Sequence, residues 1–457
     1  MEKIFTFHET VRGYFHAVNG FPCEDSSASF SSENGKYHIA IVADGHGSKS
    51  CFRSNIGSRV ATEVAMEVLR QFADEILASE NTENKFYEDA FSDFHYQHTM
   101  VRSITNAILA KWYDRVLENY KMEPPSLEEK NEYAYECENK QNIAHIYGTT
   151  LIAALQIPGG MILLQQGDGR CEVFYEDGTV DQPIPWDWRC ENTTTTSLCD
   201  EDAAECFRSC VINLREKPII ACYLGCDGIE DAYRDTYEGL GNSHILMGGV
   251  HTFYKYLTCQ MSQVDFNSWL PDFLENFSTN GIFSRSGSGD DISVAGIVDL
   301  DKALHESEHY AYDVKLYELE EKLFWHEDAL RGKTRKHAIL QKRFNEVQTE
   351  YDHARSEYQD LQKSLVQMQL QKKKEQIEFS KIENKYIRIR KNLLKVDEDI
   401  KIKEEKLHNL LNCIQEFEIK RNEACAIYEE YDSKYREIET ERNKLIQEIS
   451  ALQKENN

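Results

Sequence analysis

Proline and glycine nearly disappear from the last third of this chain of 457 residues. All eight prolines lie at or before Pro271, and Gly332 is the only glycine after Gly296. A segment without these turn-forming residues can only be long helix or disorder. We therefore place a domain boundary near Asp299 and expect two structural parts.

Basic residues are scarce before this boundary. Residues 1–300 contain 46 Asp and Glu but only 22 Lys and Arg, whereas the remainder is nearly balanced. Binding to nucleic acid or to an anionic membrane requires clustered Lys and Arg, so we expect neither partner. The chain has no apolar run of transmembrane length, and its first residues do not form a secretory signal. The 13 scattered cysteines are typical of free thiols in a reducing compartment, so we expect a cytoplasmic protein.

Within residues 1–300 the apolar segments are short and bounded by Gly, Pro or Asp-Gly, which is typical of antiparallel strands. Apolar residues spaced by three and four predict helices over 54–77 and about 97–120. Asp177-Gly178 supplies a tight hairpin turn. Sheets covered by a few long helices form an α+β layered domain. The predicted strands are 37–44, 148–157, 160–168, 170–177, 218–227 and 291–300.

Aspartates stand at the ends of several predicted strands. Asp44, Asp168 and Asp227 each end a strand, and Asp290 and Asp291 precede another. If a sheet brings such ends together, the carboxylates repel one another unless divalent cations lie among them. Oxygen ligands of this kind suit magnesium, manganese or calcium better than zinc. A single Asp-Gly pair is more often only a turn, so the wider sequence context has to distinguish the two interpretations.

A zinc site is a second metal hypothesis. Cys190, Cys199, Cys206 and Cys210 lie close together in the sequence, but their spacing matches no familiar zinc motif. We therefore interpret them as small buried residues and a loop.

Six motifs occur in order over residues 1–300: RGYFHAVNGFPCEDSS (12–27), VADGHGS (42–48), YGTTLIAAL (147–155), QQGDGRCEV (165–173), YLGCDGIEDA (223–232) and SGSGDDISVAGIV (286–298). In this order and at about these intervals they resemble the metal-dependent PPM phosphatases of type 2C, and the first resembles the bacterial branch of that family. The resemblance implies a four-layer α-β-β-α sandwich. It also implies hydrolysis of phosphoserine and phosphothreonine in a phosphoprotein substrate, with two Mn²⁺ or Mg²⁺ ions.

The resemblance also implies roles for individual residues. Asp44 would bridge the two metal ions, whose bridging water becomes the nucleophile. His46 would be the general acid that protonates the leaving group. The implied metal ligands are Asp25, Asp44, the carbonyl of Gly45, Asp227 and Asp290, with Glu24 as a further candidate, and Asp168 and Asp231 match a weaker third site.

Some positions depart from the family pattern. Eukaryotic members carry a phosphate-binding arginine shortly before the Glu24-Asp25 position, and here that place is near Gly20. Arg12 is the nearest upstream candidate for substrate binding. Asp291 is expected to support the loop, and residues 181–217 lie where relatives carry a variable flap, which we expect to select substrates.

Two alternatives to an active protein phosphatase remain. One is a catalytically inactive, phosphatase-like scaffold that acts through the rest of the chain. Against this alternative, the chain retains five aspartates of the motifs, namely Asp44, Asp168, Asp227, Asp231 and Asp290. The other is a metal-dependent phosphodiesterase or nuclease, and the acidic charge of residues 1–300 argues against its polyanionic substrate.

The last part of the chain has a sustained heptad pattern. From Leu340 to Leu452, 28 of 33 positions at alternating spacings of four and three are apolar or aromatic. One long helix cannot bury this seam alone, so we expect a helical linker over 301–339, with a hinge or a change of packing near Gly332, and a coiled coil over 340–457. Its partner stays open between a parallel homodimer, which we prefer, an antiparallel pairing and a helix of another coiled-coil protein. The polar exceptions are Lys372, Glu375, Lys403, Arg421 and Arg442.

Overall fold

The computed structural model describes residues 4–78, 83–86, 90–91, 93–133, 137, 140–190, 194–233, 248–284, 286–379 and 386–455. The chain divides into two compact units, Met1–Glu321 and Lys322–Asn457. The domain limits expected from the sequence, at residues 300 and 339, stay predictions. Within the described residues, no helix is both long and apolar enough to cross a membrane.

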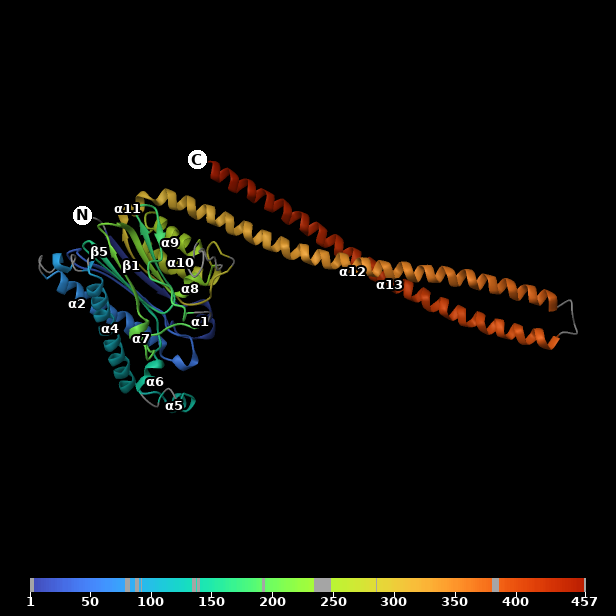
Figure 1. Ribbon diagram of the computed structural model, residues 1–457, viewed down its shortest axis with the longest axis horizontal. Coiled ribbons are helices and arrows are strands. Elements are labelled where there is room, and N and C mark those ends of the chain that lie inside the picture. The colour runs from blue at the N-terminus through green and yellow to red at the C-terminus, as the bar shows by residue number, and fades with distance from the viewer. Residues whose placement is uncertain are drawn as a thin grey trace. The chain divides into compact units, whose positions relative to one another are not determined.

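Two antiparallel five-stranded sheets form the centre of the first unit (Figure 1). One sheet has the order β1-β10-β9-β6-β7, and the other has the order β2-β3-β4-β5-β8. The strands are β1 (Ile4–Val11), β2 (Ser26–Ser31), β3 (His38–Ala43), β4 (Leu151–Ile157), β5 (Gly160–Gln166), β6 (Arg170–Tyr175), β7 (Val180–Asp181), β8 (Arg208–Asn213), β9 (Ile219–Gly225) and β10 (Ile292–Asp299).

Helices cover the outer face of each sheet. The helical elements are α1 (Tyr14–Asn19), the 3₁₀ helix η1 (Lys49–Cys51), α2 (Ser54–Ile76), α4 (Phe94–Met122), α5 (Leu127–Glu132), α6 (Lys140–His145), α7 (Ala203–Cys206), α8 (Asp227–Glu230), α9 (Gly249–Gln260), α10 (Phe266–Asn280), α11 (Leu300–His305), α12 (Ser307–Phe379) and α13 (Tyr386–Glu455). Helices α2 and α4 pack on the sheet that contains β3, and α9 and α10 pack on the sheet that contains β10.

Alternation along the strands separates three hydrophobic layers. In β3, Ile39 and Ile41 face helices α2 and α4, whereas Ala40 and Val42 face the second sheet. Trp112 of α4 is fully buried in the outer layer, and its Nε1 donates to the Gly57 carbonyl at 3.0 Å. Together the layers form a four-layer α-β-β-α sandwich, so the predicted fold class is confirmed.

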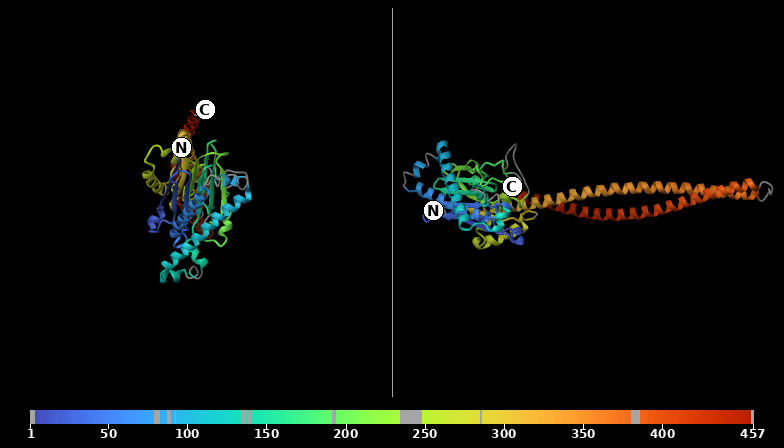
Figure 2. Two further views of the ribbon diagram at one scale, coloured as in Figure 1. Left: turned by 90° about the vertical axis from the view of Figure 1, so that its left-hand side faces the viewer. Right: turned by 90° about the horizontal axis from the view of Figure 1, so that it is seen from below.

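The second unit contains α13 and the part of α12 from Lys322 onward, and these two helices run antiparallel to each other. As the residue number of a contact rises along α12, the number of its partner falls along α13. The contacts that join them are Glu327 with Arg442, Tyr351 with Glu418, Ser364 with Lys403 and Lys372 with Asp397. Figures 1 and 2 show the two helices of this hairpin side by side.

The hairpin accounts for most of the polar residues in the heptad seam. Lys372, Lys403 and Arg442 each contact a side chain of the opposite helix. The Arg421 guanidinium lies 5.2 Å from the ring centroid of Tyr351. These cations therefore have partners within the same chain.

One expectation for this region is wrong. The helix expected to run unbroken from Leu340 ends at Phe379, and the chain returns as α13. Helix α12 continues through Gly332 without a break, so of the two expectations there only the change of packing stays a prediction. Periodicity shows that a seam must be covered, but it does not say which helix covers it. Residues 380–385, between the helices, lie outside the described residues.

Candidate metal centre

Antiparallel register brings the predicted ligands to one end of the sandwich. Ser26 of β2 pairs with Ala43 of β3, so Asp25 and Asp44, each one residue beyond, lie opposite each other. In the other sheet the end of β9 lies beside the start of β10 and the start of β6. Asp227 follows β9, so it lies near the loops that precede β10 and β6.

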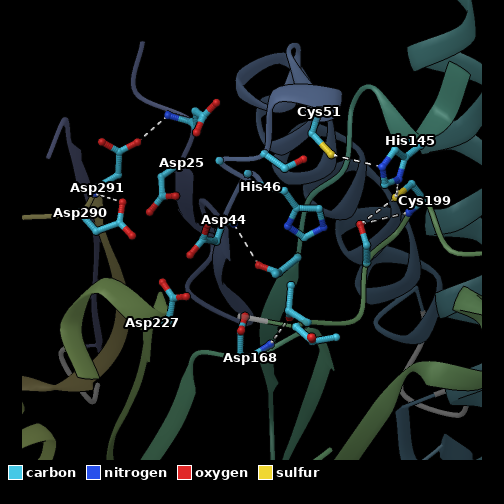
Figure 3. Close-up of a pocket in the computed structure, with 18 of the residues that line it drawn as sticks. Asp25, Asp44, His46, Cys51, His145, Asp168, Cys199, Asp227, Asp290 and Asp291 are labelled. Atoms are coloured by element: carbon cyan, nitrogen blue, oxygen red, sulfur yellow. Dashed lines mark hydrogen bonds between the residues drawn. The ribbon is translucent and has the colours of Figure 1, made fainter. Parts of the chain in front are cut away.

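These loops enclose a cavity of about 570 Å³ (Figure 3). No Lys or Arg belongs to its lining in the part of the chain that the structure describes. The cavity is therefore strongly anionic and suited to a multivalent cation. Its eight carboxylates belong to Glu24, Asp25, Asp44, Asp168, Asp200, Asp227, Asp290 and Asp291.

Asp25 and Asp44 form the closest part of this cluster. Their carboxylate oxygens and the Cys226 sulfur lie within 4.8 Å of one another. Cys226 already accepts a hydrogen bond from the Ser293 N–H at 3.1 Å. Asp25 Oδ2 is buried and has no hydrogen-bond partner among the described residues. A buried carboxylate oxygen without a hydrogen-bond partner, close to a second carboxylate, is a suitable ligand for a hard divalent cation. The residues present therefore fit Mn²⁺ or Mg²⁺.

The protonation equilibria agree with this arrangement. Burial raises the pKa of Asp25, Asp44 and Asp227 well above the ordinary value, and neighbouring carboxylates raise them further. Each charged form is disfavoured because it loses water and meets other negative charges. In this pocket either protons or cations must balance the charge.

Asp290 and Asp291 are adjacent but differ in their surroundings. The Asp290 side chain lines the cavity and is half exposed. The Asp291 carboxylate is buried and accepts hydrogen bonds from the Gly13 N–H at 2.6 Å, the Glu24 N–H at 2.6 Å and His16 Nδ1 at 2.9 Å. Asp290 can therefore bind a cation, whereas Asp291 holds the α1 loop in place.

Of the two residues expected at a third metal site, one lies in the cavity and the other does not. Asp168 lines the cavity, and its N–H donates to Thr195 Oγ1 at 3.1 Å. Asp231 is exposed at the end of α8 and is not part of the cavity lining. The structure thus brings Asp168, but not Asp231, to the cavity.

His46 lies in the cavity directly after Asp44 and Gly45. Burial, followed by the charge of His145, lowers its pKa to about 4. The backbone N–H of His46 donates to the Gly148 carbonyl at 3.1 Å. A Cβ atom on Gly148 would lie 2.5 Å from His46 Cδ2, so only glycine leaves room for the ring.

Arg12 is not brought to the cavity. It is exposed, and its Nη1 donates to the Phe21 carbonyl at 3.4 Å. His16, four residues later, does line the cavity, with its Nε2 3.9 Å from carboxylate oxygens of Glu24 and Asp290. The position of His16 within the first motif was the only sequence signal for it.

Sequence reasoning also missed a second wall of the cavity, formed by Cys51, His145 and residues 194–200. Residues 194–200 belong to the segment 181–217, which we expected to correspond to a variable flap of the family. The four cysteines considered as a zinc site do not converge: among the described residues, Cys206 groups with Asp200 and Asp202, and Cys199 contacts His145. The interpretation against zinc agrees with this arrangement.

The chain is similar to a known protein family. Residues 12–275, more than half of the chain, match the family model described as protein phosphatase 2C. No curated protein sequence matches.

The solved structures that match this chain include three of 14–15% sequence identity. The serine/threonine phosphatase Stp1 from Staphylococcus aureus is 14% identical, with 65% of this chain and 95% of that chain covered and a TM-score of 0.34. The catalytic domain of the serine/threonine protein phosphatase PstP, in complex with two manganese ions, is 15% identical over 65% and 97%, with a TM-score of 0.36. A C. elegans sex determining protein is 14% identical over 66% and 67%, with a TM-score of 0.38.

Proposed function

Because the chain belongs to the protein phosphatase 2C family, whose members are protein serine/threonine phosphatases, we propose that it hydrolyses phosphoserine and phosphothreonine with two divalent cations held in the carboxylate cavity. The observation that carries the proposal is the gathering of eight carboxylates without a Lys or Arg among the described lining residues. A phosphate dianion cannot enter such a cavity until cations reverse its charge.

The proposed ligands come from five separate segments of the chain. Asp25, Asp44, Asp227, Asp290 and the carbonyl of Gly45 would hold the two ions. Asp168 would belong to a weaker site, and Asp231, which the structure does not bring to the cavity, stays a prediction. When bound, Mn²⁺ or Mg²⁺ ions supply an activated water nucleophile and stabilise the charge of the phosphoryl group.

The chain itself contributes orientation and a proton. Asp291 fixes the loop of Gly13 and the backbone of Glu24, and so positions Asp25. We assign His46 as the group that protonates the leaving oxygen. Its low pKa makes the imidazolium a strong acid, but a rare one at neutral pH, so proton donation is limited to a small protonated fraction.

The last parts of the proposal concern the partner of the helical tail and the cellular location of the protein. The prediction of a parallel homodimer, or of another coiled-coil protein as partner, gains no support from the hairpin, in which α13 contacts α12 of the same chain. Both partners therefore stay predictions, as does a cytoplasmic location with a tail that positions the enzyme near its phosphoprotein substrate.

The test is hydrolysis of a phosphothreonine peptide and of p-nitrophenyl phosphate by the full chain, with MnCl2 and with EDTA. Asp44→Asn and Asp227→Asn should each lower the manganese-dependent rate by roughly 10²–10³. Asp177→Asn, at the exposed hairpin turn, is the matched control and should keep the full rate. Equal, metal-independent traces from all four proteins would refute the proposal and favour an inactive scaffold.

A further inference from the structure

One wall of the cavity carries a histidine between two cysteines (Figure 3). His145 Nε2 lies 3.8 Å from Cys51 Sγ, and its Nδ1 lies 3.6 Å from Cys199 Sγ. All three residues line the cavity, and none of them is used in the proposed hydrolysis. Two thiols and an imidazole form a reactive group only if one thiol gives up its proton.

The hydrogen bonds of Ser197 show where the hydrogen of the Cys199 thiol points. The Ser197 hydroxyl donates to the Thr149 carbonyl at 3.1 Å, and its oxygen accepts from the Thr149 N–H at 3.1 Å. Cys199 Sγ lies 3.1 Å from the same oxygen. Since the single hydroxyl hydrogen is already used, the Cys199 thiol must be the donor in this contact. The hydrogen of the Cys199 thiol therefore points to Ser197 and not to His145.

Cys51 is then the partner that can release a proton to the imidazole. Hydrogen bonds with Cys199 and Cys51 raise the pKa of His145 to about 10. An imidazolium carries a hydrogen on both ring nitrogens, and here both nitrogens face sulfur. The Ser50 hydroxyl, 3.3 Å from Nε2, is a further partner on the same side of the ring. His145 is therefore placed to take the proton of Cys51 as the sulfur reacts, so that the attacking group is a thiolate.

Cys51 also lies against the proposed catalytic histidine. A Cβ atom on Gly148 would lie 2.5 Å from His46 Cδ2 and 3.2 Å from Cys51 Sγ. Both side chains thus pack on the same glycine. An oxygen atom added to this sulfur would crowd His46, His145 and the Gly148 backbone, because the thiol is buried at the cavity wall beside them.

We propose that Cys51 is a modification site, at which hydrogen peroxide that enters the cavity oxidises the thiol to a sulfenic acid and stops the phosphatase. The thiolate sulfur attacks one peroxide oxygen, so an S–O bond forms and the O–O bond breaks. Sulfur loses two electrons, and the leaving hydroxide takes the proton from His145 Nε2 to become water. The products are Cys51 sulfenic acid, neutral His145 and water. The loss of activity rests on the proposed function, whereas the oxidation itself does not.

The first test measures the chemistry without any activity assay. The metal-free full chain is treated with hydrogen peroxide and dimedone at pH 7, and the adducts at Cys51 and Cys413 are quantified by mass spectrometry. Cys413 is an exposed thiol of α13 and serves as the internal reference. An ordinary thiol is about 3% thiolate at this pH, so a full thiolate can react up to about 30-fold faster. We expect labelling of Cys51 at least about tenfold faster than labelling of Cys413, and a drop to the Cys413 level in His145→Gln. Labelling of Cys51 no faster than that of Cys413 would overturn the proposal.

The second test uses matched serine variants. Peroxide should abolish manganese-dependent hydrolysis by the unmodified chain, and dithiothreitol should restore it. Cys51→Ser should keep the basal rate and resist peroxide, whereas Cys199→Ser should remain sensitive. If Cys51→Ser is inactivated as fast as the unmodified chain, or Cys199→Ser alone is protected, the assignment to Cys51 is wrong. An inactive protein with rapid Cys51 labelling would count against the proposed function and leave the modification site standing.

Discussion

Replacing Asp44 by asparagine should stabilise the metal-free protein while abolishing its response to manganese. The carboxylate oxygens of Asp44 and Asp25 lie within 4.8 Å of each other. At an effective dielectric constant of about 20, two charges at that distance repel by about 3 kcal/mol. Burial raises the pKa of both carboxyls above their unfolded values, so a bound proton relieves part of this repulsion. The charged forms therefore weaken the fold as pH rises, and we expect Asp44→Asn to gain about 1–3 kcal/mol at pH 7.5.

The assay is thermal unfolding of the full chain in EDTA and in MnCl2. In EDTA the variant should melt roughly 2–8 °C above the unmodified chain. In manganese at about 100 times the dissociation constant, the unmodified chain should gain about 2.7 kcal/mol per site, and the variant should gain little. Asp177→Asn should behave like the unmodified chain in both conditions. A variant that is less stable than the unmodified chain in EDTA would refute the reasoning, because the buried charges would then not repel each other.

Four further outcomes follow from the same structure. Manganese should raise the melting temperature more at pH 8 than at pH 6, because protons held by the raised pKa values of Asp44 and Asp227 must leave before an ion binds; equal shifts would contradict this. Trp112→Ala should cost about 3–5 kcal/mol in urea unfolding, and a loss below about 1 kcal/mol would contradict its complete burial. Gly148→Ala should lower kcat at least about tenfold by displacing His46, with the manganese-induced rise in melting temperature retained; an unchanged kcat would count against the role of His46. Light scattering of the full chain should give the mass of two chains if the predicted homodimer forms, whereas a mass of one chain would contradict it and leave only the contacts of α12 with α13 in the same chain.

Much of the sandwich could be predicted because its central strands are mostly apolar and almost wholly buried. The six expected strands correspond to β3, β4, β5, β6, β9 and β10, and the two expected helices to α2 and α4. The edge strands were missed. β1 and β2 carry Thr, His and Ser side chains that pair with one another, as His8 does with Ser29 at 2.9 Å. Such half-polar strands lack the signal by which a buried strand is recognised.

The site was predictable where chain position fixes geometry. Asp44 and Asp227 follow buried strands, so register alone brings them to one end of the sandwich. His145 and Cys199 could not be found in this way, because they reach the cavity through loops whose paths depend on tertiary packing. Arg12 was chosen for its charge, and the structure leaves it on the surface.

The tail shows the limit of periodicity in another way. The heptad phase runs through residues 380–385 without a glycine or proline, so nothing in the pattern distinguishes one long helix from two. The informative residues were the cations within the seam. Lys372 and Arg442 in an apolar interface imply acidic partners, and Asp397 and Glu327 lie at the antiparallel positions. A search for opposite charges at a constant sum of residue numbers is the signal that sequence reasoning did not use.

The central claim is that the carboxylate cavity holds divalent cations, and anomalous scattering from crystals of the full chain grown with MnCl2 tests it most directly. The account predicts two strong peaks at the manganese edge among Asp25, Asp44, Asp227 and Asp290, and their loss in Asp44→Asn. Strong diffraction with no anomalous peak in this cavity, at manganese concentrations that support hydrolysis, would contradict it.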